Sequence, residues 1–241
     1  MSGTLYLIST PIGNEKDITL RAIDILNECD LVICEEWKPA RRLFQLHKID
    51  KPLLRLNEHS TAEDEKEIVD MLLLEGKAIA LISDCGTPLI ADPGSSLVKT
   101  CITFGITVVP IPGPSSILAA LVVSGFSLEQ FSFVGFLPRE KDERKQAASA
   151  LKNRTETLVL LEAPYRLQQV ISDLTDGIGS ERQACVCLDL TLPNEKIIRG
   201  SLSEIREYFQ QRPFKGEFVI IIKGAGRSGP RNLPRNKRNR R

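Results

Sequence analysis

The stretch AIALISDCGTPLIADPG, residues 78–94, joins an unbroken apolar run to a loop rich in glycine, proline and aspartate. An apolar run of this length that ends in turn residues is typical of a strand buried on both faces. The helical segment SSLVKTCITFG follows at 95–105, and Gly105 stands where the C-cap of a helix is expected. A strand, a loop and a helix in this order indicate a parallel α/β sheet.

The same order recurs on both sides of this stretch. Strands are expected at 4–9, 31–36, 53–58 and 106–112, and helices at 17–30, 39–46 and 62–77. Because these strands are apolar throughout rather than alternating, the sheet should be mostly parallel and covered by helices on both faces.

The pattern changes at PGPSSILAALVVSG, residues 112–125. Beyond it, strands are expected at 131–138, 157–164, 184–191 and 217–224, and helices at 140–152, 164–175 and 202–210. We therefore expect an α/β protein with two α/β domains, residues 1–114 and 115–224, of which the second has a mixed sheet. A basic and disordered tail is expected at 225–241.

Composition narrows the class of protein. The content of 42% hydrophobic and 26% charged residues is that of a soluble globular protein. No apolar stretch reaches the roughly 18 residues of a spanning helix, and the start lacks a basic n-region. We expect no membrane segment, no export and a cytoplasmic location. The six cysteines form no CxxC pair, so reduced thiols are expected and no metal site.

The charge is distributed unevenly. Residues 223–241 hold eight lysines and arginines and no acid, so the formal charge of +1 becomes −7 over residues 1–222. Such a tail is attracted to phosphate-rich polymers, although a solubilising role explains it as well. An RNA site on the acidic remainder would have to be a local basic patch.

Three turn-rich loops each follow an expected strand directly. They are TPIGN at 10–14, SDCGTP at 83–88 with its continuation to residue 94, and PIPGPSS at 110–116. Ligands of open α/β sheets bind outside the carboxyl ends of the strands, so these loops predict one crevice for a small ligand. Neither GxGxxG nor GxxxxGK[ST] occurs, which argues against dinucleotide and P-loop sites. Spacing alone does not name the ligand.

A family resemblance indicates which small ligand these loops bind. It is carried by LYLISTPIGNEKDITLRAIDIL, LLEGKAIALISDCGTPLIADPG, VVPIPGPSSILAAL, FVGFLPREKDERK, TLVLLEAPYRL and GEFVIII. In these segments the chain resembles the tetrapyrrole-methylase superfamily, and within it the branch of ribosomal RNA small-subunit 2′-O-methyltransferases that modify a cytidine. The resemblance implies two α/β domains with an S-adenosylmethionine cleft between them, a homodimer, and ribosomal RNA or the small ribosomal subunit as partner.

The resemblance also implies which residues contact the cofactor. Most belong to the three loops and contact it through the backbone, whereas Leu161 lines the adenosine pocket from the second domain. The implied contacts are Pro11, Gly13, Asp84, Gly86, Thr87, Pro88, Ser115, Ser116 and Leu161.

The substrate side departs from the family pattern. Residues 35–39 are EEWKP where the branch usually has Glu-Asp-Thr-Arg, and residues 162–166 are EAPYR where it usually has Glu-Ser-Pro-His-Arg. The later run that is usually Arg-Glu-Leu-Thr-Lys is LDLTL at 188–192. These changes affect the identity of the substrate more than cofactor binding.

Methyl transfer from a sulfonium requires the nucleophile in line with the methyl group, and a nearby base would help a weak nucleophile such as a ribose 2′-OH. The side chains predicted as this base are Glu35, Glu36, Glu58 and His59; an ordinary solvated or ion-paired role is the alternative for each. The side chains predicted to hold RNA phosphates are Arg21, Lys38, Arg41, Arg42, Arg139 and Arg166.

Two other functions fit the sequence. One is a methyltransferase that acts on a small molecule such as a tetrapyrrole, for which the basic tail would be incidental. The other is a noncatalytic RNA-binding or ribosome-assembly protein that has kept the fold. Binding of S-adenosylmethionine would count against the second. Salt-dependent RNA binding that is lost with residues 225–241 would favour RNA over a small molecule.

Overall fold

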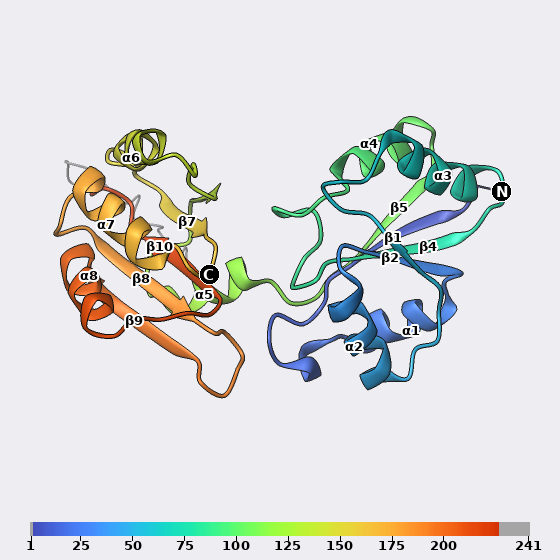
Figure 1. Ribbon diagram of the computed structural model, residues 1–241, viewed down its shortest axis with the longest axis horizontal. Helices are drawn as coiled ribbons and strands as arrows, with labels where there is room; N and C mark the ends of the chain where they lie inside the picture. Colours follow the sequence, from blue (N-terminus) through green and yellow to red (C-terminus); the bar gives the residue numbers. More distant parts are fainter. Residues whose placement is uncertain (1, 227–241) are drawn as a thin grey trace, which may run out of the picture.

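The computed structural model describes residues 2–226, which form two α/β domains side by side (Figure 1). The first domain contains a parallel sheet of five strands in the order β3-β2-β4-β1-β5. Its elements are β1 (Thr4–Ile8), a 3-10 turn η1 (Glu15–Asp17), α1 (Leu20–Glu28), β2 (Leu31–Cys34), α2 (Trp37–His47), β3 (Leu53–Arg55), α3 (Ala62–Leu73), β4 (Ala78–Ile82), α4 (Ser95–Thr103) and β5 (Thr107–Ile111).

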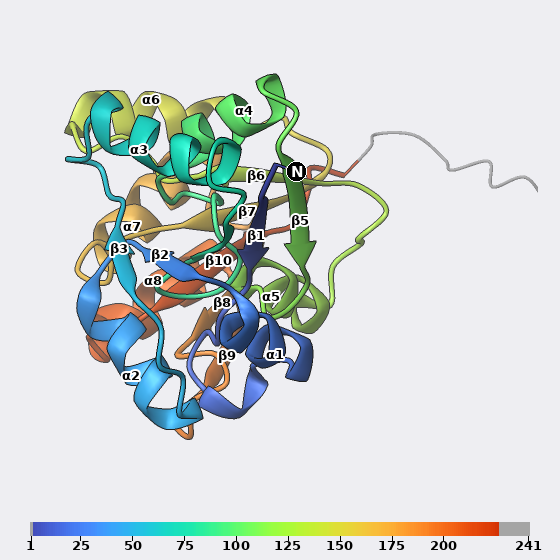
Figure 2. The same cartoon turned by 90° about the vertical axis from the view of Figure 1, so that its right-hand side faces the viewer.

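Helices cover both faces of this sheet, as the apolar strands predict. Helices α1 and α2 pack on one face, and α3 and α4 pack on the other (Figure 2). The neighbouring strands β1 and β4 lead into helices on opposite faces. The loops after these two strands therefore diverge, and this is the topological switch point at which open α/β sheets bind ligands.

The second domain contains a mixed sheet in the order β6-β7-β10-β8-β9, in which only β6 and β7 pair in parallel. Its elements are α5 (Ser116–Ser124), β6 (Phe131–Gly135), α6 (Lys141–Ala150), β7 (Thr157–Leu161), α7 (Leu167–Ile178), β8 (Gln183–Leu188), β9 (Lys196–Ser201), α8 (Leu202–Gln211) and β10 (Phe218–Ile222). Helices α6, α7 and α8 pack on one face, and α5 packs on the other.

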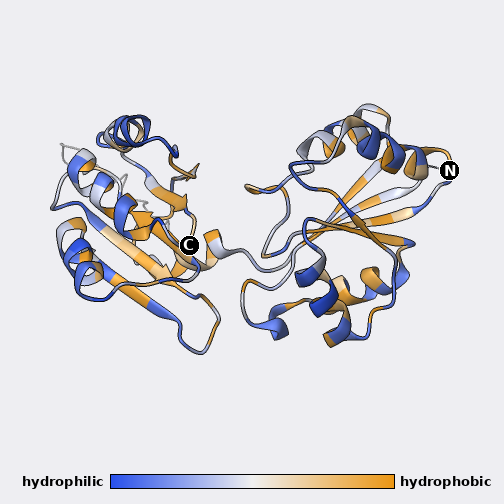
Figure 3. Cartoon of the chain, in the orientation of Figure 1, coloured by the Kyte–Doolittle hydropathy of each residue, from blue (hydrophilic) through white to orange (hydrophobic). Residues whose placement is uncertain are grey.

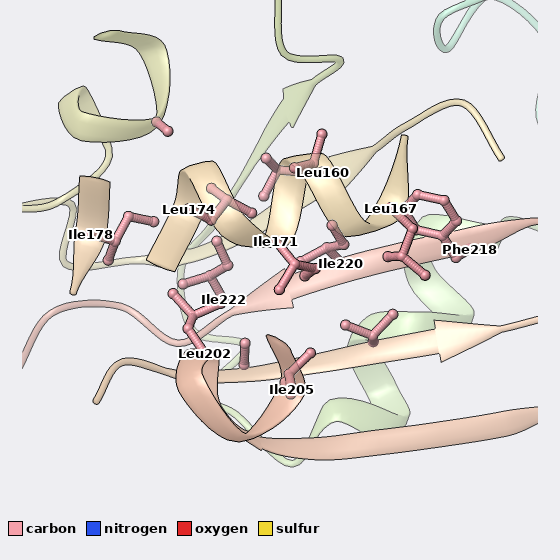
Figure 4. Packing of buried hydrophobic residues seen from close by; sticks show 14 of the residues in the cluster. Leu160, Leu167, Ile171, Leu174, Ile178, Leu202, Ile205, Phe218, Ile220 and Ile222 are labelled. Atoms are coloured by element: carbon pink, nitrogen blue, oxygen red, sulfur yellow. The ribbon is translucent and has the colours of Figure 1, made fainter. Parts of the chain in front are cut away.

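The core of the second domain lies between this sheet and its outer helices. Leu167, Ile171 and Leu174 recur at helical spacing on one side of α7 and contact Ile220 and Ile222 of β10 (Figure 4). Both sheets carry apolar residues along their strands, whereas the outer helices turn polar faces outward (Figure 3). Burial of this apolar surface is the main stabilising contribution to each domain.

The predicted fold class, two α/β domains, is confirmed, while several predicted elements differ in detail. Strand β9 was not predicted, because the exposed residues Lys196 and Arg199 interrupt the apolar pattern of this edge strand. Helix α1 begins later than expected, because the Thr19 side chain accepts a hydrogen bond from the Ala22 N–H and caps it there.

The basic segment predicted at 225–241 lies, apart from residues 225 and 226, outside the described residues. Within residues 2–226, no helix has the length and apolar character needed to cross a membrane.

Candidate functional site

The three predicted loops meet at the switch point of the first sheet. The Thr10 N–H donates to the Gly86 carbonyl at 2.9 Å, and the Thr10 hydroxyl donates to the Ser83 carbonyl at 3.0 Å. The Thr87 hydroxyl donates to the Pro114 carbonyl at 3.1 Å. These bonds hold the loops after β1, β4 and β5 together as one unit.

The second domain touches this unit at the first loop. The Asn14 N–H donates to the Thr191 hydroxyl at 2.8 Å. A Cβ atom at Gly13 would lie 2.7 Å from the Leu190 carbonyl oxygen, so the backbones approach too closely for any other residue. Gly13 therefore has a role that its predicted cofactor contact does not describe: it permits the contact between the domains.

Left-handed backbone conformations of residues other than glycine gather at the loops around the site. Leu89 and Ala91 have φ of 71° and 69°, and Asp189 and Thr191 have φ of 46° and 68°. Such conformations cost about 1–3 kcal/mol each and persist where the surroundings hold them, as they often do beside binding sites.

A cavity of about 170 Å³, here called the interdomain cavity, lies between these loops and the second domain. One side is formed by the second and third loops and the start of α5. The other side is formed by the ends of the central strands β7, β10 and β8 of the second sheet. It is lined by Ile12, Cys85, Thr87, Ile90, Ala91, Asp92, Ser115, Ser116, Ile117, Phe136, Leu161, Glu162, Cys187, Leu190, Glu217, Phe218 and Val219.

The interdomain cavity is acidic. Asp92, Glu162 and Glu217 line it, and no lysine or arginine among residues 2–226 does. Burial raises the pKa of Asp92, and burial together with the nearby Asp189 raises the pKa of Glu217. Each pKa is raised because nearby positive charges and hydrogen bonds do not offset the hydration that the ionised carboxylate loses on burial. The cavity therefore favours a ligand that carries positive charge.

A second cavity of about 380 Å³, here called the α2 cavity, adjoins the first. Ile12 and Cys85 line both and form their common wall. The α2 cavity contains charges of both signs, from Lys38, Arg42 and Asp84. Its lining is Thr10, Pro11, Ile12, Gly13, Glu15, Lys38, Pro39, Ala40, Arg42, Leu43, Ile82, Ser83, Asp84, Cys85 and Leu192.

The residues predicted to contact the cofactor divide between the two cavities. Thr87, Ser115, Ser116 and Leu161 line the interdomain cavity. Pro11, Gly13 and Asp84 line the α2 cavity. Pro88 lines a small neighbouring cavity instead, and Gly86, with φ of 86°, contributes its carbonyl to the loop contact described above.

The four residues predicted as a base differ in burial and in their partners. Glu35 is half-buried, and its pKa is raised by burial first and then by Asp92 and Asp84. Glu36 forms an ion pair with Arg55 at 2.6 Å. Glu58 and His59 form an exposed pair at 3.6 Å and line neither cavity.

The predicted phosphate-binding residues separate as well. Lys38 and Arg42 line the α2 cavity, where Arg42 also pairs with Glu15 at 2.7 Å. The Arg41 guanidinium lies 5.5 Å from the centre of the Trp37 ring. Arg21 and Arg139 are exposed and line neither cavity.

Arg166, also predicted to bind phosphate, lies in the interior of the second domain. This residue is buried, and its guanidinium donates to the carbonyls of Leu137 and Pro138 at 3.1 and 2.8 Å. It also pairs with Glu162 at 2.8 Å. These internal contacts engage the guanidinium within the protein, and the role of Arg166 in binding phosphate stays a prediction.

Sequence reasoning missed most residues of the interdomain cavity wall. Ile12, Cys85 and Asp92 lie within the quoted loops and could have been found there. Glu162 directly follows the predicted Leu161. Nothing in the sequence indicated Glu217, because it lies before a strand, whereas the predicted loops all follow strands. It reaches the cavity because β10 is antiparallel to β7, so that β10 starts beside the end of β7.

Comparisons with known proteins agree with this architecture. The chain is 41% identical over 224 residues to a protein of Halalkalibacterium halodurans named ribosomal RNA small subunit methyltransferase I, over 93% of this chain and 77% of the relative. It is 39% identical to the protein of that name from Thermotoga maritima, over 92% of this chain and 99% of the relative. A solved diphthine synthase shares the fold, with a TM-score of 0.71 at 15% identity, over 92% of this chain and 90% of that one.

The family model described as tetrapyrrole (corrin/porphyrin) methylases matches residues 4–206, which include both cavities except for Glu217, Phe218 and Val219. The match therefore covers the switch point, the three loops and most of the second sheet. Together with the two relatives, it shows that the chain belongs to the tetrapyrrole methylases and is a methyltransferase.

Proposed function

We propose that this methyltransferase uses S-adenosylmethionine to methylate the 2′-OH of a cytidine in small-subunit ribosomal RNA, and that it acts in the cytoplasm. The observation that carries the proposal is the pair of adjoining cavities with Ile12 and Cys85 as their common wall. One cavity is acidic and largely apolar, and the other contains lysine and arginine. Such an arrangement suits a cationic methyl donor on one side and a phosphate-bearing acceptor on the other.

The residues of the interdomain cavity fit S-adenosylmethionine. Asp92 and Glu162 each have a buried carboxylate oxygen without a hydrogen-bond partner among the described residues. A ligand with N–H donors and positive charge would supply what these oxygens lack. Phe136 and Phe218 offer apolar surface to a purine ring. When bound, the cofactor supplies a methyl group activated by the positive sulfur.

The α2 cavity fits a nucleotide. Lys38 and Arg42 would bind phosphate oxygens and position the ribose, and Asp84 lies in the same cavity. Burial raises the pKa of Asp84, although its carboxylate accepts a hydrogen bond from the Glu36 N–H at 3.1 Å. A carboxyl group with a raised pKa is a better proton acceptor near neutral pH. We propose that Asp84 removes the proton of the 2′-OH, with the nearby Glu35, whose pKa is also raised, as the other candidate base.

The proposal is tested by incubating the protein with radiolabelled S-adenosylmethionine and unmodified small ribosomal subunits. Nuclease digestion of the labelled RNA should yield one 2′-O-methylated cytidine. If no RNA is labelled while calorimetry shows cofactor binding, the acceptor is a small molecule and tetrapyrroles are the next substrates to test. If the cofactor does not bind, its assignment to the interdomain cavity is wrong.

The double substitution K38A/R42A should weaken RNA binding without affecting the cofactor. Each phosphate contact that is removed lowers the slope of log affinity against log salt by about 1, so the slope should fall by about 2. RNA affinity is measured over a salt series, and S-adenosylhomocysteine affinity by calorimetry. K99A changes an exposed lysine of α4 that lines neither cavity, and it should leave both unchanged. An unaltered slope in K38A/R42A would place the RNA elsewhere.

We also propose that the chain forms a homodimer through the outer face of α5. Leu118 and Val122 lie one turn apart on this helix and are 55% and 69% exposed, whereas Ile117 and Leu121 pack on the second sheet. Apolar side chains adjacent on a surface are typical of an interface. Light scattering should give twice the mass of one chain for the wild type and the mass of one chain for L118E/V122E. The matched change L74E, at an exposed leucine after α3, should leave the mass unchanged. A wild type of single-chain mass contradicts the dimer.

A further inference from the structure

Glu162 has a buried carboxylate in which one oxygen accepts hydrogen bonds and the other has no partner among the described residues. It directly follows β7, its side chain is 1% exposed, and it lines the interdomain cavity. Its Oε1 accepts from the Ala163 N–H at 2.9 Å and from Arg166 at 2.8 Å. Its Oε2 is buried and meets no donor within residues 2–226. A buried acceptor of this kind costs free energy unless a ligand supplies the donor.

Arg166 fixes which oxygen is left over. Its guanidinium is itself held by the carbonyls of Leu137 and Pro138, at the end of the neighbouring strand β6. The Glu162 carboxylate therefore cannot rotate without losing its ion pair and its bond to the Ala163 N–H. The remaining oxygen, Oε2, is the one without a partner, and its position is set by the fold rather than by the ligand.

The surroundings indicate which part of the ligand lies beside this oxygen. The second domain contributes the apolar side chains Phe136, Leu161 and Phe218 to the cavity. The hydroxyl groups of Thr87, Ser115 and Ser116 line the opposite side. A flat apolar ring belongs on the first side, and hydroxyl and amino-acid groups belong on the second. The donor nearest to Glu162 should therefore belong to the edge of the ring.

We propose that Glu162 determines the specificity for adenine by accepting a hydrogen bond from the 6-amino group of the cofactor's base. The inference rests on the proposed use of S-adenosylmethionine and deepens it. A charged acceptor at this place attracts an amino group and repels a carbonyl oxygen, so a 6-oxopurine would be rejected. The wild type should bind S-adenosylhomocysteine roughly tenfold to 100-fold more tightly than its 6-oxo analogue, S-inosylhomocysteine.

The substitution E162Q should reverse this preference. Arg166 and the Ala163 N–H both donate to the position of Oε1, so the amide oxygen of the glutamine must occupy it. The amide nitrogen then takes the place of Oε2 and offers a donor where the carboxylate offered an acceptor. E162Q should therefore bind the 6-oxo analogue at least as tightly as S-adenosylhomocysteine. The ratio of the two dissociation constants is unaffected by any general weakening of the site.

Calorimetry with the full chain measures both ligands, and thermal melting checks that E162Q is folded. The control E181Q changes an exposed carboxylate that lines neither cavity, and it should leave the ratio as in the wild type. Equal binding of the two ligands to the wild type overturns the inference, even if E162Q fails to fold. An equal loss for both ligands in E162Q also overturns it, because Glu162 would then hold the ribose. If S-adenosylhomocysteine does not bind to the wild type, the proposed cofactor fails as well.

Discussion

Replacement of Gly13 by alanine should lower kcat/KM for RNA methylation about 100-fold. The new Cβ would lie 2.7 Å from the Leu190 carbonyl oxygen and 2.8 Å from the Thr191 hydroxyl, both in the second domain. The two backbones would have to move apart, and with them the two sides of the interdomain cavity. A misplacement of about 1 Å between reacting groups costs roughly 100-fold in rate, whereas overpacking costs only about 1–3 kcal/mol of stability.

The measurement is single-turnover methylation beside a thermal melt of the same variant. G226A is the matched control, because a Cβ at Gly226 meets nothing within 4 Å. It should retain wild-type activity. If G13A keeps more than about a third of the wild-type rate, the loop adapts locally and the spacing of the domains does not depend on this glycine.

Replacement of Asp173 by leucine should remove about 3–5 kcal/mol from the free energy of unfolding. Asp173 of α7 pairs with Arg144 of α6 at 2.6 Å, and their side chains are 8% and 2% exposed. Without the carboxylate, a buried guanidinium remains with no opposite charge. Its bond to the Arg139 carbonyl, at 2.7 Å, does not replace the lost charge. Urea unfolding followed by circular dichroism measures the loss.

Two further variants separate the buried charge from other causes. R144M/D173L removes both charges and keeps similar volume, so it should recover most of the stability that D173L loses. D176L changes an exposed aspartate of α7, the same helix that carries Asp173. Its Oδ1 lies 3.2 Å from a guanidinium nitrogen of Arg206 in α8. This substitution should change the free energy of unfolding by less than about 1 kcal/mol. If D173L and D176L lower the free energy of unfolding equally, burial does not explain the contribution of the Arg144–Asp173 pair to stability.

Much of the fold could be predicted because buried parallel strands are continuous apolar runs. AIALI at 78–82 and FVIII at 218–222 are both strands without an exposed side chain. The order of the strands could not be predicted, since the position of β4 between β1 and β2 depends on which helix covers which face. Strand β9 was missed for the related reason that an edge strand needs no apolar periodicity.

The loops of the site could be predicted from the sequence. Which charged residues line a cavity and which are buried in the interior could not. Lys38 and Arg166 look alike in the sequence as basic residues near family motifs. One lines the α2 cavity, whereas the other is buried against carbonyls 28 and 29 residues earlier in the chain. Burial of a charge is decided by such distant partners, and a single sequence does not reveal them.

In the proposed arrangement, the common wall of Ile12 and Cys85 separates the methyl donor from the acceptor. The interdomain cavity lies against the second sheet, whereas the α2 cavity takes Lys38 and Arg42 from the outer surface of one helix. Under the proposed function, new side chains in place of Lys38 and Arg42 should therefore alter the choice of acceptor while the interdomain cavity keeps its lining. An engineer who wishes to redirect this enzyme to another RNA should begin at α2, and the methyl supply need not be redesigned.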